Sequence, residues 1–238
     1  MNKVFKELYD TLEEVVIDKW DRYQYNGKFV PRITEILSAM LHEDYLMRWS
    51  NAMGFKRKSY QSILDDSANI GTIAHGAIED YLMKGIDYDY LSDERAYNCF
   101  LAFKDWWKII SANQYKILMQ EEMMTCEYFG GTLDLLIEIN GEIFLVDFKT
   151  SNHLSYKYIL QLAAYRYLLR ETKGIEIAGC IILRLDKFSA EFEEVMFHFQ
   201  DAENLKLFEI AEYEFLALCY AYINRLYIEN QFNNYNKG

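Results

Sequence analysis

The chain contains a single proline, Pro31, and only 11 glycines among its 238 residues. No Gly/Ser-rich linker, internal repeat or shift in composition interrupts it. Because domain boundaries usually fall in such linkers, we expect one domain over residues 1–238. Its expected parts are an N-terminal helical segment (about 1–65), a core (about 66–200) and a C-terminal helix (about 202–228).

Long apolar runs are also missing. No stretch approaches the roughly 18 residues of a membrane-spanning helix. The amino terminus lacks the basic start and the apolar run of a signal peptide. We therefore expect a soluble, cytoplasmic protein that does not enter a membrane.

Cysteine is scarce, and no two cysteines form a C-x-x-C pair. The four residues are Cys99, Cys126, Cys180 and Cys219. This spacing is typical of reduced, buried thiols and argues against a disulfide framework.

An excess of positive charge is absent too, since 37 acidic and 25 basic residues give a net charge of −12. Lys and Arg supply most of the nonspecific affinity of proteins for nucleic acid, so this balance argues against such binding. Net charge describes the far field, however, whereas a groove needs only local positive potential. The densest basic run is Lys56-Arg57-Lys58, which a solvated surface would also explain.

Residues 133–149 form the most informative stretch, because two alternating apolar runs flank Asn140-Gly141. This dipeptide favours a two-residue hairpin turn, in which both central positions need φ > 0. Ile139 would then pair with Glu142, and the same register places position 134 opposite position 147. The apolar side chains share one face of the hairpin, which we expect to be buried. They are Leu133, Leu135, Ile137, Ile139, Phe144, Val146 and Phe148.

The opposite face carries Asp134 and Asp147, and Lys149 follows on the same face. The two Asp Cβ atoms would lie about 5 Å apart. Carboxylates this close repel each other, so the pattern indicates a compensating cation, of which Lys149 supplies one charge at most. Because Mg²⁺ is usually held by one or two carboxylates, we interpret the pair as a metal site. Solvated charges on an edge hairpin would give the same pattern.

Neighbouring elements can bring further polar side chains to this face. His75 and Glu79 lie four apart on an expected helix, so both can face one site. Glu121 and Glu122 lie on the strand expected before the hairpin, and their side chains point to opposite faces. We favour Glu121 and keep Glu122 as the alternative.

Apolar periodicity predicts the remaining elements. The expected helices cover residues 3–18, 32–42, 70–83, 93–113, 155–171 and 202–228. The expected strands cover 116–125, 176–184 and 191–199, with a small hairpin over 23–30. The Asn-rich tail, 230–236, is expected to fray. This order predicts an α/β fold with a central mixed β-sheet flanked by helices.

Five motifs follow one another along the chain. They are Pro31-Arg32-Ile33-Thr34-Glu35-Ile36-Leu37, Gly71-Thr72-Ile73-Ala74-His75-Gly76-Ala77-Ile78-Glu79, Gly131-Thr132-Leu133-Asp134, Asp147-Phe148-Lys149 and Gln161-x-x-x-Tyr165. In this order, over roughly residues 29–170, they resemble the PD-(D/E)XK nuclease superfamily, and more narrowly its RecB-like branch with the phage-type exonucleases. The resemblance implies a restriction-endonuclease-like core. Leu133 replaces the proline of the family name, which leaves the acid in place.

The resemblance also implies roles for individual residues. His75, Asp134, Asp147 and the backbone carbonyl of Phe148 would bind Mg²⁺ or Mn²⁺. Lys149 would assist the attacking water. Iron–sulfur members of the branch carry a close group of cysteines after the core, which this chain lacks, so we expect no iron–sulfur cluster.

The helix after the hairpin would position DNA. Gln161 and Tyr165 resemble the positioning motif of the branch, and Lys157 lies on the same four-residue stripe. A glutamate before the hairpin often lines the site in this family, which implies a catalytic role for Glu121 or a supporting role for Glu122.

The expected function is metal-dependent hydrolysis of DNA, by an exonuclease that acts on DNA ends in recombination, repair or phage DNA metabolism. A structure-specific endonuclease would share every motif. A noncatalytic module that binds nucleic acid or another protein could keep the same fold. The expected partner is DNA, and the sequence leaves open a homo-oligomer or a recombination protein.

Overall fold

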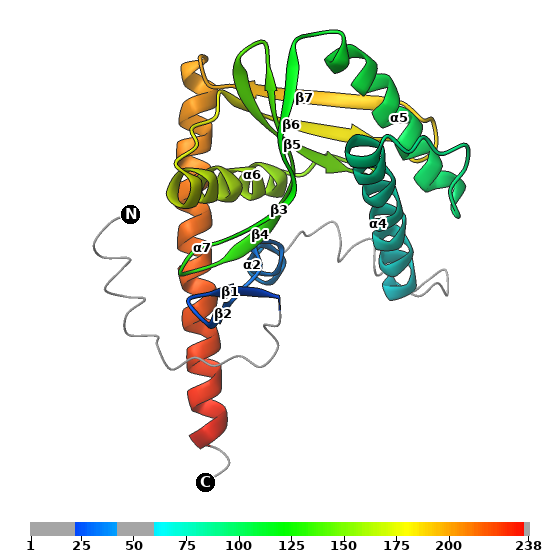
Figure 1. The fold of residues 1–238 in the computed structure, drawn as a ribbon. Helices are drawn as coiled ribbons and strands as arrows, with labels where there is room; N and C mark the ends of the chain where they lie inside the picture. Colours follow the sequence, from blue (N-terminus) through cyan, green and yellow to red (C-terminus); the bar gives the residue numbers. More distant parts are fainter. Residues whose placement is uncertain (1–21, 42–59, 236–238) are drawn as a thin grey trace.

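The computed structural model describes residues 22–41 and 60–235. A five-stranded sheet lies at its centre, with the strands side by side in chain order (Figure 1). They are β3 (Tyr115–Thr125), β4 (Gly130–Ile139), β5 (Glu142–Lys149), β6 (Gly179–Leu185) and β7 (Phe192–His198). Neighbours are antiparallel except for the parallel pair β5 and β6. The predicted mixed sheet is therefore confirmed.

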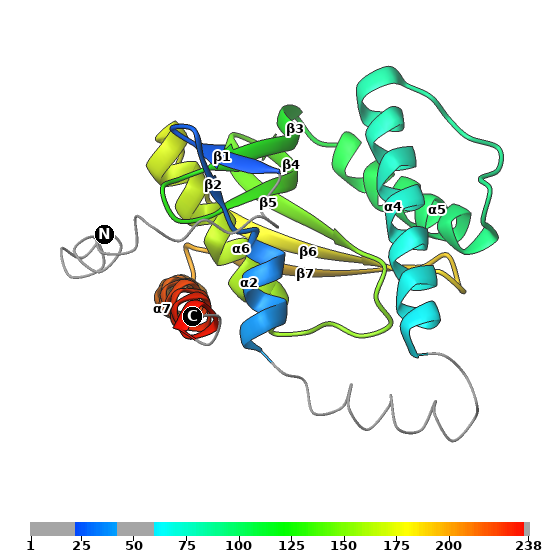
Figure 2. The same cartoon turned by 90° about the horizontal axis from the view of Figure 1, so that it is seen from below.

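Helices cover both faces of this sheet, as Figure 2 shows. One apolar core joins the sheet to α4 (Tyr60–Lys84) and α5 (Glu94–Ser111). The other joins it to α2 (Ile33–Met40), α6 (Lys157–Leu168) and α7 (Ala202–Tyr235). A π-helical turn, η1 (Leu169–Lys173), continues α6. The flanking helices thus confirm the predicted α/β architecture.

A small hairpin of β1 (Tyr23–Tyr25) and β2 (Lys28–Val30) packs beside the start of β4. The Tyr23 ring lies so close to Gly130 that a Cβ atom at Gly130 would come within 2.7 Å of it. The hydroxyl groups of Tyr23 and Thr132 share a hydrogen bond of 2.9 Å. The N-terminal hairpin is therefore held against the strand that carries Asp134.

The β4–β5 hairpin has the predicted turn and register. Asn140 and Gly141 have φ values of 52° and 88°, which a two-residue turn of this kind requires. The paired residues run from Ile139 opposite Glu142 to Leu135 opposite Val146.

One residue of the predicted buried face lies elsewhere. Five of the seven side chains are buried in the core beneath α4 and α5, and Ile139 packs at its edge. Leu133 instead belongs to the core beneath α2 and α6. The reason is that β4 pairs with β5 only as far as Leu135 and continues beyond it beside β3, with Arg32 bridging to Gly130 at its start. The expectation that the apolar side chains along the whole of β4 share one buried face was therefore wrong.

Several predicted boundaries also differ from the structure. The helix expected over 70–83 begins at Tyr60, and the helix expected over 202–228 continues to Tyr235. Extending a formed helix adds one hydrogen bond per residue without a new nucleation cost, so polar residues can prolong it. The Asn-rich tail, expected to fray, is instead helical through Tyr235. The helix expected over 3–18 and the basic run Lys56-Arg57-Lys58 lie outside the described residues.

All four cysteines are buried free thiols, as their spacing predicts. Within the described segments, no helix has an apolar stretch sufficient to cross a bilayer.

Candidate active site

Asp134 and Asp147 lie next to the last residue pair of β4 and β5, Asp134 just before Leu135 and Asp147 just after Val146 along the chain. The register that ends with Leu135 opposite Val146 places the two aspartates opposite each other at the next position. There the Phe148 backbone N–H donates a 2.7 Å hydrogen bond to Oδ2 of Asp134. This bond fixes one carboxylate oxygen and leaves Oδ1 to face the other site residues.

His75 comes from α4, on the other side of this carboxylate. Its Nδ1 lies 3.7 Å from Oδ1 of Asp134, and its ring meets the Phe148 ring edge to face at 5.9 Å between centroids. His75, Glu121 and Asp134 each offer one ligand atom, and these three atoms lie within 4.8 Å of one another. Such a group can hold a metal ion.

Glu121 reaches this group from β3, the strand that pairs with β4. Gln120 pairs with Leu135 and Glu122 pairs with Leu133, so Glu121 lies opposite Asp134. Its φ of 47° lies in the left-handed region, which residues other than glycine seldom adopt.

The two candidate glutamates have different surroundings. Burial, together with the carboxylates of Asp134 and Glu79, raises the pKa of Glu121 to about 8. Glu122 accepts a 2.8 Å hydrogen bond from Nζ of Lys173. The structure thus brings Glu121, and not Glu122, into the group with His75 and Asp134.

Lys149 lies beside Asp147, and both are largely buried. Nζ is 2.6 Å from Oδ2 of Asp147, whose side chain is 2% exposed. Burial raises the pKa of Asp147, and the Lys149 ammonium opposes that shift. Burial lowers the pKa of Lys149, but the Asp147 and Asp134 carboxylates outweigh this effect and raise it. Lys149 therefore keeps its positive charge.

The motif residues of α6 extend this arrangement. Nζ of Lys149 donates a 3.0 Å hydrogen bond to Oε1 of Gln161. The Gln161 amide nitrogen in turn donates to the Tyr165 hydroxyl at 3.3 Å. Gln161 and Tyr165 are both buried, so the contacts hold the ammonium in one position.

The donor set fits a divalent metal ion. Oδ2 of Asp147 is buried and receives no hydrogen bond from the described residues, although it lies in ionic contact with Lys149. Asp134 and Glu121 bring two carboxylates together with His75, while Asp147 lies outside this group of three and contacts the Lys149 ammonium. An additional cation would relieve the repulsion between the two carboxylates, and Mg²⁺ and Mn²⁺ favour oxygen ligands of this kind.

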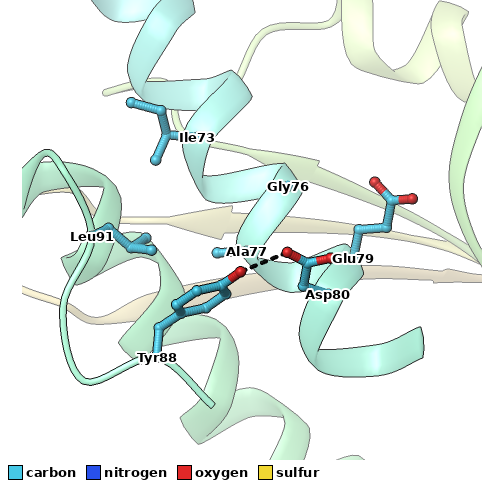
Figure 3. A pocket seen from close by; sticks show the side chains of 7 residues that line it. All are labelled: Ile73, Gly76, Ala77, Glu79, Asp80, Tyr88 and Leu91. Atoms are coloured by element: carbon cyan, nitrogen blue, oxygen red, sulfur yellow. Dashed lines mark hydrogen bonds between the residues drawn. The ribbon is translucent and has the colours of Figure 1, made fainter. Parts of the chain in front are cut away.

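Glu79 lies one helical turn after His75, at the rim of a pocket of about 350 Å³ (Figure 3). Its carboxylate points away from Tyr88. Asp80, on the same rim, accepts 2.6 Å hydrogen bonds from Lys84 and from the Tyr88 hydroxyl. The full lining consists of Ile73, Gly76, Ala77, Glu79, Asp80, Tyr88 and Leu91.

Lys157 does not join the hydrogen bonds that link Lys149 to Gln161 and Tyr165, the other two residues of its predicted stripe. Its Nζ donates a 2.9 Å hydrogen bond to the backbone carbonyl of Leu41, just after α2. Tyr158, which sequence reasoning missed, instead has its ring 4.7 Å from Nζ of Lys149. Tyr158, Gln161 and Tyr165 recur at i, i+3 and i+7, and this spacing could have indicated that Tyr158 lies on the same face of the helix as the two motif residues.

The comparisons with known proteins give one informative match. The model of the PD-(D/E)XK nuclease superfamily matches residues 48–226. No curated protein matches the chain.

Two solved structures that match are distant. SSO0001 is 14% identical with a TM-score of 0.35, over 87% of this chain and 82% of that chain. LHK-Exo in complex with dAMP is 15% identical with a TM-score of 0.33, over 66% of this chain and 83% of that chain. Scores this low carry no argument about the site. The family match spans most of the sequence and includes His75, both aspartates, Lys149 and Gln161, so the chain belongs to the PD-(D/E)XK nuclease superfamily.

Proposed function

We propose that this protein hydrolyses phosphodiester bonds of DNA with the help of Mg²⁺ or Mn²⁺. The observation that carries the proposal is that ligand atoms of His75, Glu121 and Asp134 lie within 4.8 Å of one another, with Asp147 one position beyond the last pair of β4 and β5. These four side chains would hold the metal, with the Phe148 backbone carbonyl as a further ligand.

The metal, when bound, would polarise the scissile phosphate and lower the pKa of a coordinated water. The protein's own part begins with Lys149, whose ammonium is held by Asp147 and Gln161. In this position it would orient the attacking water or stabilise negative charge that develops on the phosphate. Arg would not replace it, because a planar guanidinium has a different donor geometry.

We further propose an exonuclease of the RecB-like type that acts on DNA ends, in recombination, repair or phage DNA metabolism. The support is the resemblance of the His75 helix motif and of the Gln161/Tyr165 pair to that branch. Gln161 and Tyr165 would position the DNA, directly or through Lys149.

The test uses linear DNA labelled at one end and closed circular DNA, each with Mg²⁺, Mn²⁺ or EDTA. We expect cleavage of the linear DNA from its ends, abolished by EDTA and by Asp134→Asn or Lys149→Met. The matched control is Asp105→Asn, which alters an exposed acid that pairs with Lys108 on α5. Its activity should equal that of the wild type.

Three other outcomes would change the proposal. Cleavage of circular DNA would replace the exonuclease with an endonuclease. Equal activity in the wild type and in both site variants would mean that the cleavage comes from a contaminant. Metal binding without cleavage of any DNA or RNA would leave a noncatalytic module.

A further inference from the structure

Tyr158 lies in the first turn of α6 and is half-buried. The centroid of its ring is 4.7 Å from Nζ of Lys149. An ammonium within about 6 Å of an aromatic face is attracted by the negative potential of the ring, and more strongly when water is excluded. The Lys149 side chain is only 16% exposed, so this attraction acts in a largely dry environment.

The Tyr158 ring is a third contact of the Lys149 ammonium. Asp147 contacts Nζ at 2.6 Å and Gln161 accepts from it at 3.0 Å. Both partners bind it through oxygen atoms, whereas Tyr158 offers the face of a ring. A lysine side chain has a flexible four-carbon stem, and removing any one of these contacts would let the ammonium move.

We propose that Tyr158 is a positioning residue, whose aromatic face holds the Lys149 ammonium beside Asp147 for the reaction. This inference rests on the proposed nuclease function. It concerns the ring rather than the hydroxyl group, because the contact with Lys149 is made to the ring.

The first experiment compares two substitutions. Tyr158→Phe keeps the ring and should retain kcat within about twofold. Tyr158→Leu keeps an apolar side chain without a ring, and should lower kcat by about 5- to 30-fold while KM for DNA stays unchanged. The matched control is Tyr156→Leu, since Tyr156 is 54% exposed in the same segment.

The second experiment separates this role from simple packing. Phenylalanine with one, two or three ring fluorines is incorporated at position 158, which withdraws charge from the ring face and changes its shape little. We expect log kcat to fall steadily with each fluorine. Equal kcat across the series, or a Tyr158→Leu enzyme as active as the wild type, would overturn the proposal.

A third measurement does not depend on activity. Lysine labelled with ¹³C at Cε is incorporated, and the Lys149 signal is identified by its loss in Lys149→Arg. Its Hε protons should be shifted upfield by the ring in the wild type and in Tyr158→Phe, but not in Tyr158→Leu. An unchanged shift in Tyr158→Leu would overturn the inference. If the wild type cleaves no DNA, the proposed function fails, and this measurement alone decides the role of Tyr158.

Discussion

Glu121 lies opposite Asp134 on neighbouring strands, and one oxygen of each lies within 4.8 Å of the other and of a His75 nitrogen. Two acids in this arrangement oppose folding unless a cation or a proton separates their charges. The raised pKa of Glu121 has the same origin, burial among carboxylates. Metal binding should therefore act on stability as well as on activity.

Mn²⁺ should raise the free energy of unfolding of the wild type by about 2.7 kcal/mol at a hundred times its dissociation constant. Glu121→Gln removes one ligand and one repelling charge, so the metal-free variant should be more stable than the metal-free wild type and gain less from Mn²⁺. Thermal unfolding with and without Mn²⁺ measures both effects. Glu122→Gln is the control, and an equal loss of the Mn²⁺ effect there would contradict the assignment of Glu121.

Gly131→Ala should destabilise the fold and the site together. A Cβ atom there would come within 2.6 Å of both Ile33 and Tyr165, and relieving such overlap typically costs about 1–3 kcal/mol. Because Tyr165 contacts Gln161, cleavage should also slow. Gly76→Ala is the control, since its Cβ would meet nothing within 4 Å. Urea unfolding should find that variant about 0.5–1 kcal/mol more stable than the wild type.

Lys157→Ala and Gln161→Ala should separate stability from activity. Lys157 donates to the Leu41 carbonyl, so its loss should lower the free energy of unfolding by about 1 kcal/mol with cleavage nearly unchanged. Gln161→Ala removes an acceptor of the Lys149 ammonium and should slow cleavage about tenfold or more. Parallel kinetics and urea unfolding measure both quantities. A comparable loss of cleavage in Lys157→Ala would favour the DNA-positioning role.

Asp186 should contribute to stability in a pH-dependent way. Backbone N–H groups of Ser189 and Phe188 donate to its carboxylate at 3.0 and 2.8 Å, and these bonds lower its pKa to about 2. A lowered pKa in the folded state gives stability that is present above the ordinary value near 4 and is lost as pH falls through about 2.

Unfolding free energies between pH 6 and pH 2 measure this effect. Asp186→Asn should lose about 2 kcal/mol at pH 6 and differ little from the wild type near pH 2. A difference that stays constant over the whole range would mean that the carboxylate charge is not the cause.

Much of this fold could be predicted because local signals agreed with one another. Asn140-Gly141 and the alternation around it determine one register, and that register, continued one position beyond its last pair, puts Asp134 opposite Asp147. Leu133 could not be placed in the same way, since the end of the pairing with β5 depends on the helices that cover β4.

In the candidate site, too, some residues could be predicted from local sequence signals and others could not. The choice of Glu121 over Glu122 depends on the register of β3 against β4, which places Glu121 opposite Asp134 and which alternation within a single strand does not determine. Lys157 and Tyr158 are adjacent, and their directions depend on where α2 ends and where Lys149 lies. Such orientations follow from tertiary packing, which single-sequence periodicity does not contain.

The turn at Asn140-Gly141 lies five paired positions from the aspartates, or about 17 Å along the strands. Extra residues inserted at its tip would lengthen an exposed loop and leave every cross-strand partner in place, so this is a suitable position for a fluorescent label or an affinity tag. Deleting one residue from either strand would instead exchange inward and outward side chains between the tip and the deletion. The part of the hairpin farthest from the candidate metal ligands is therefore the part that engineering can alter most freely.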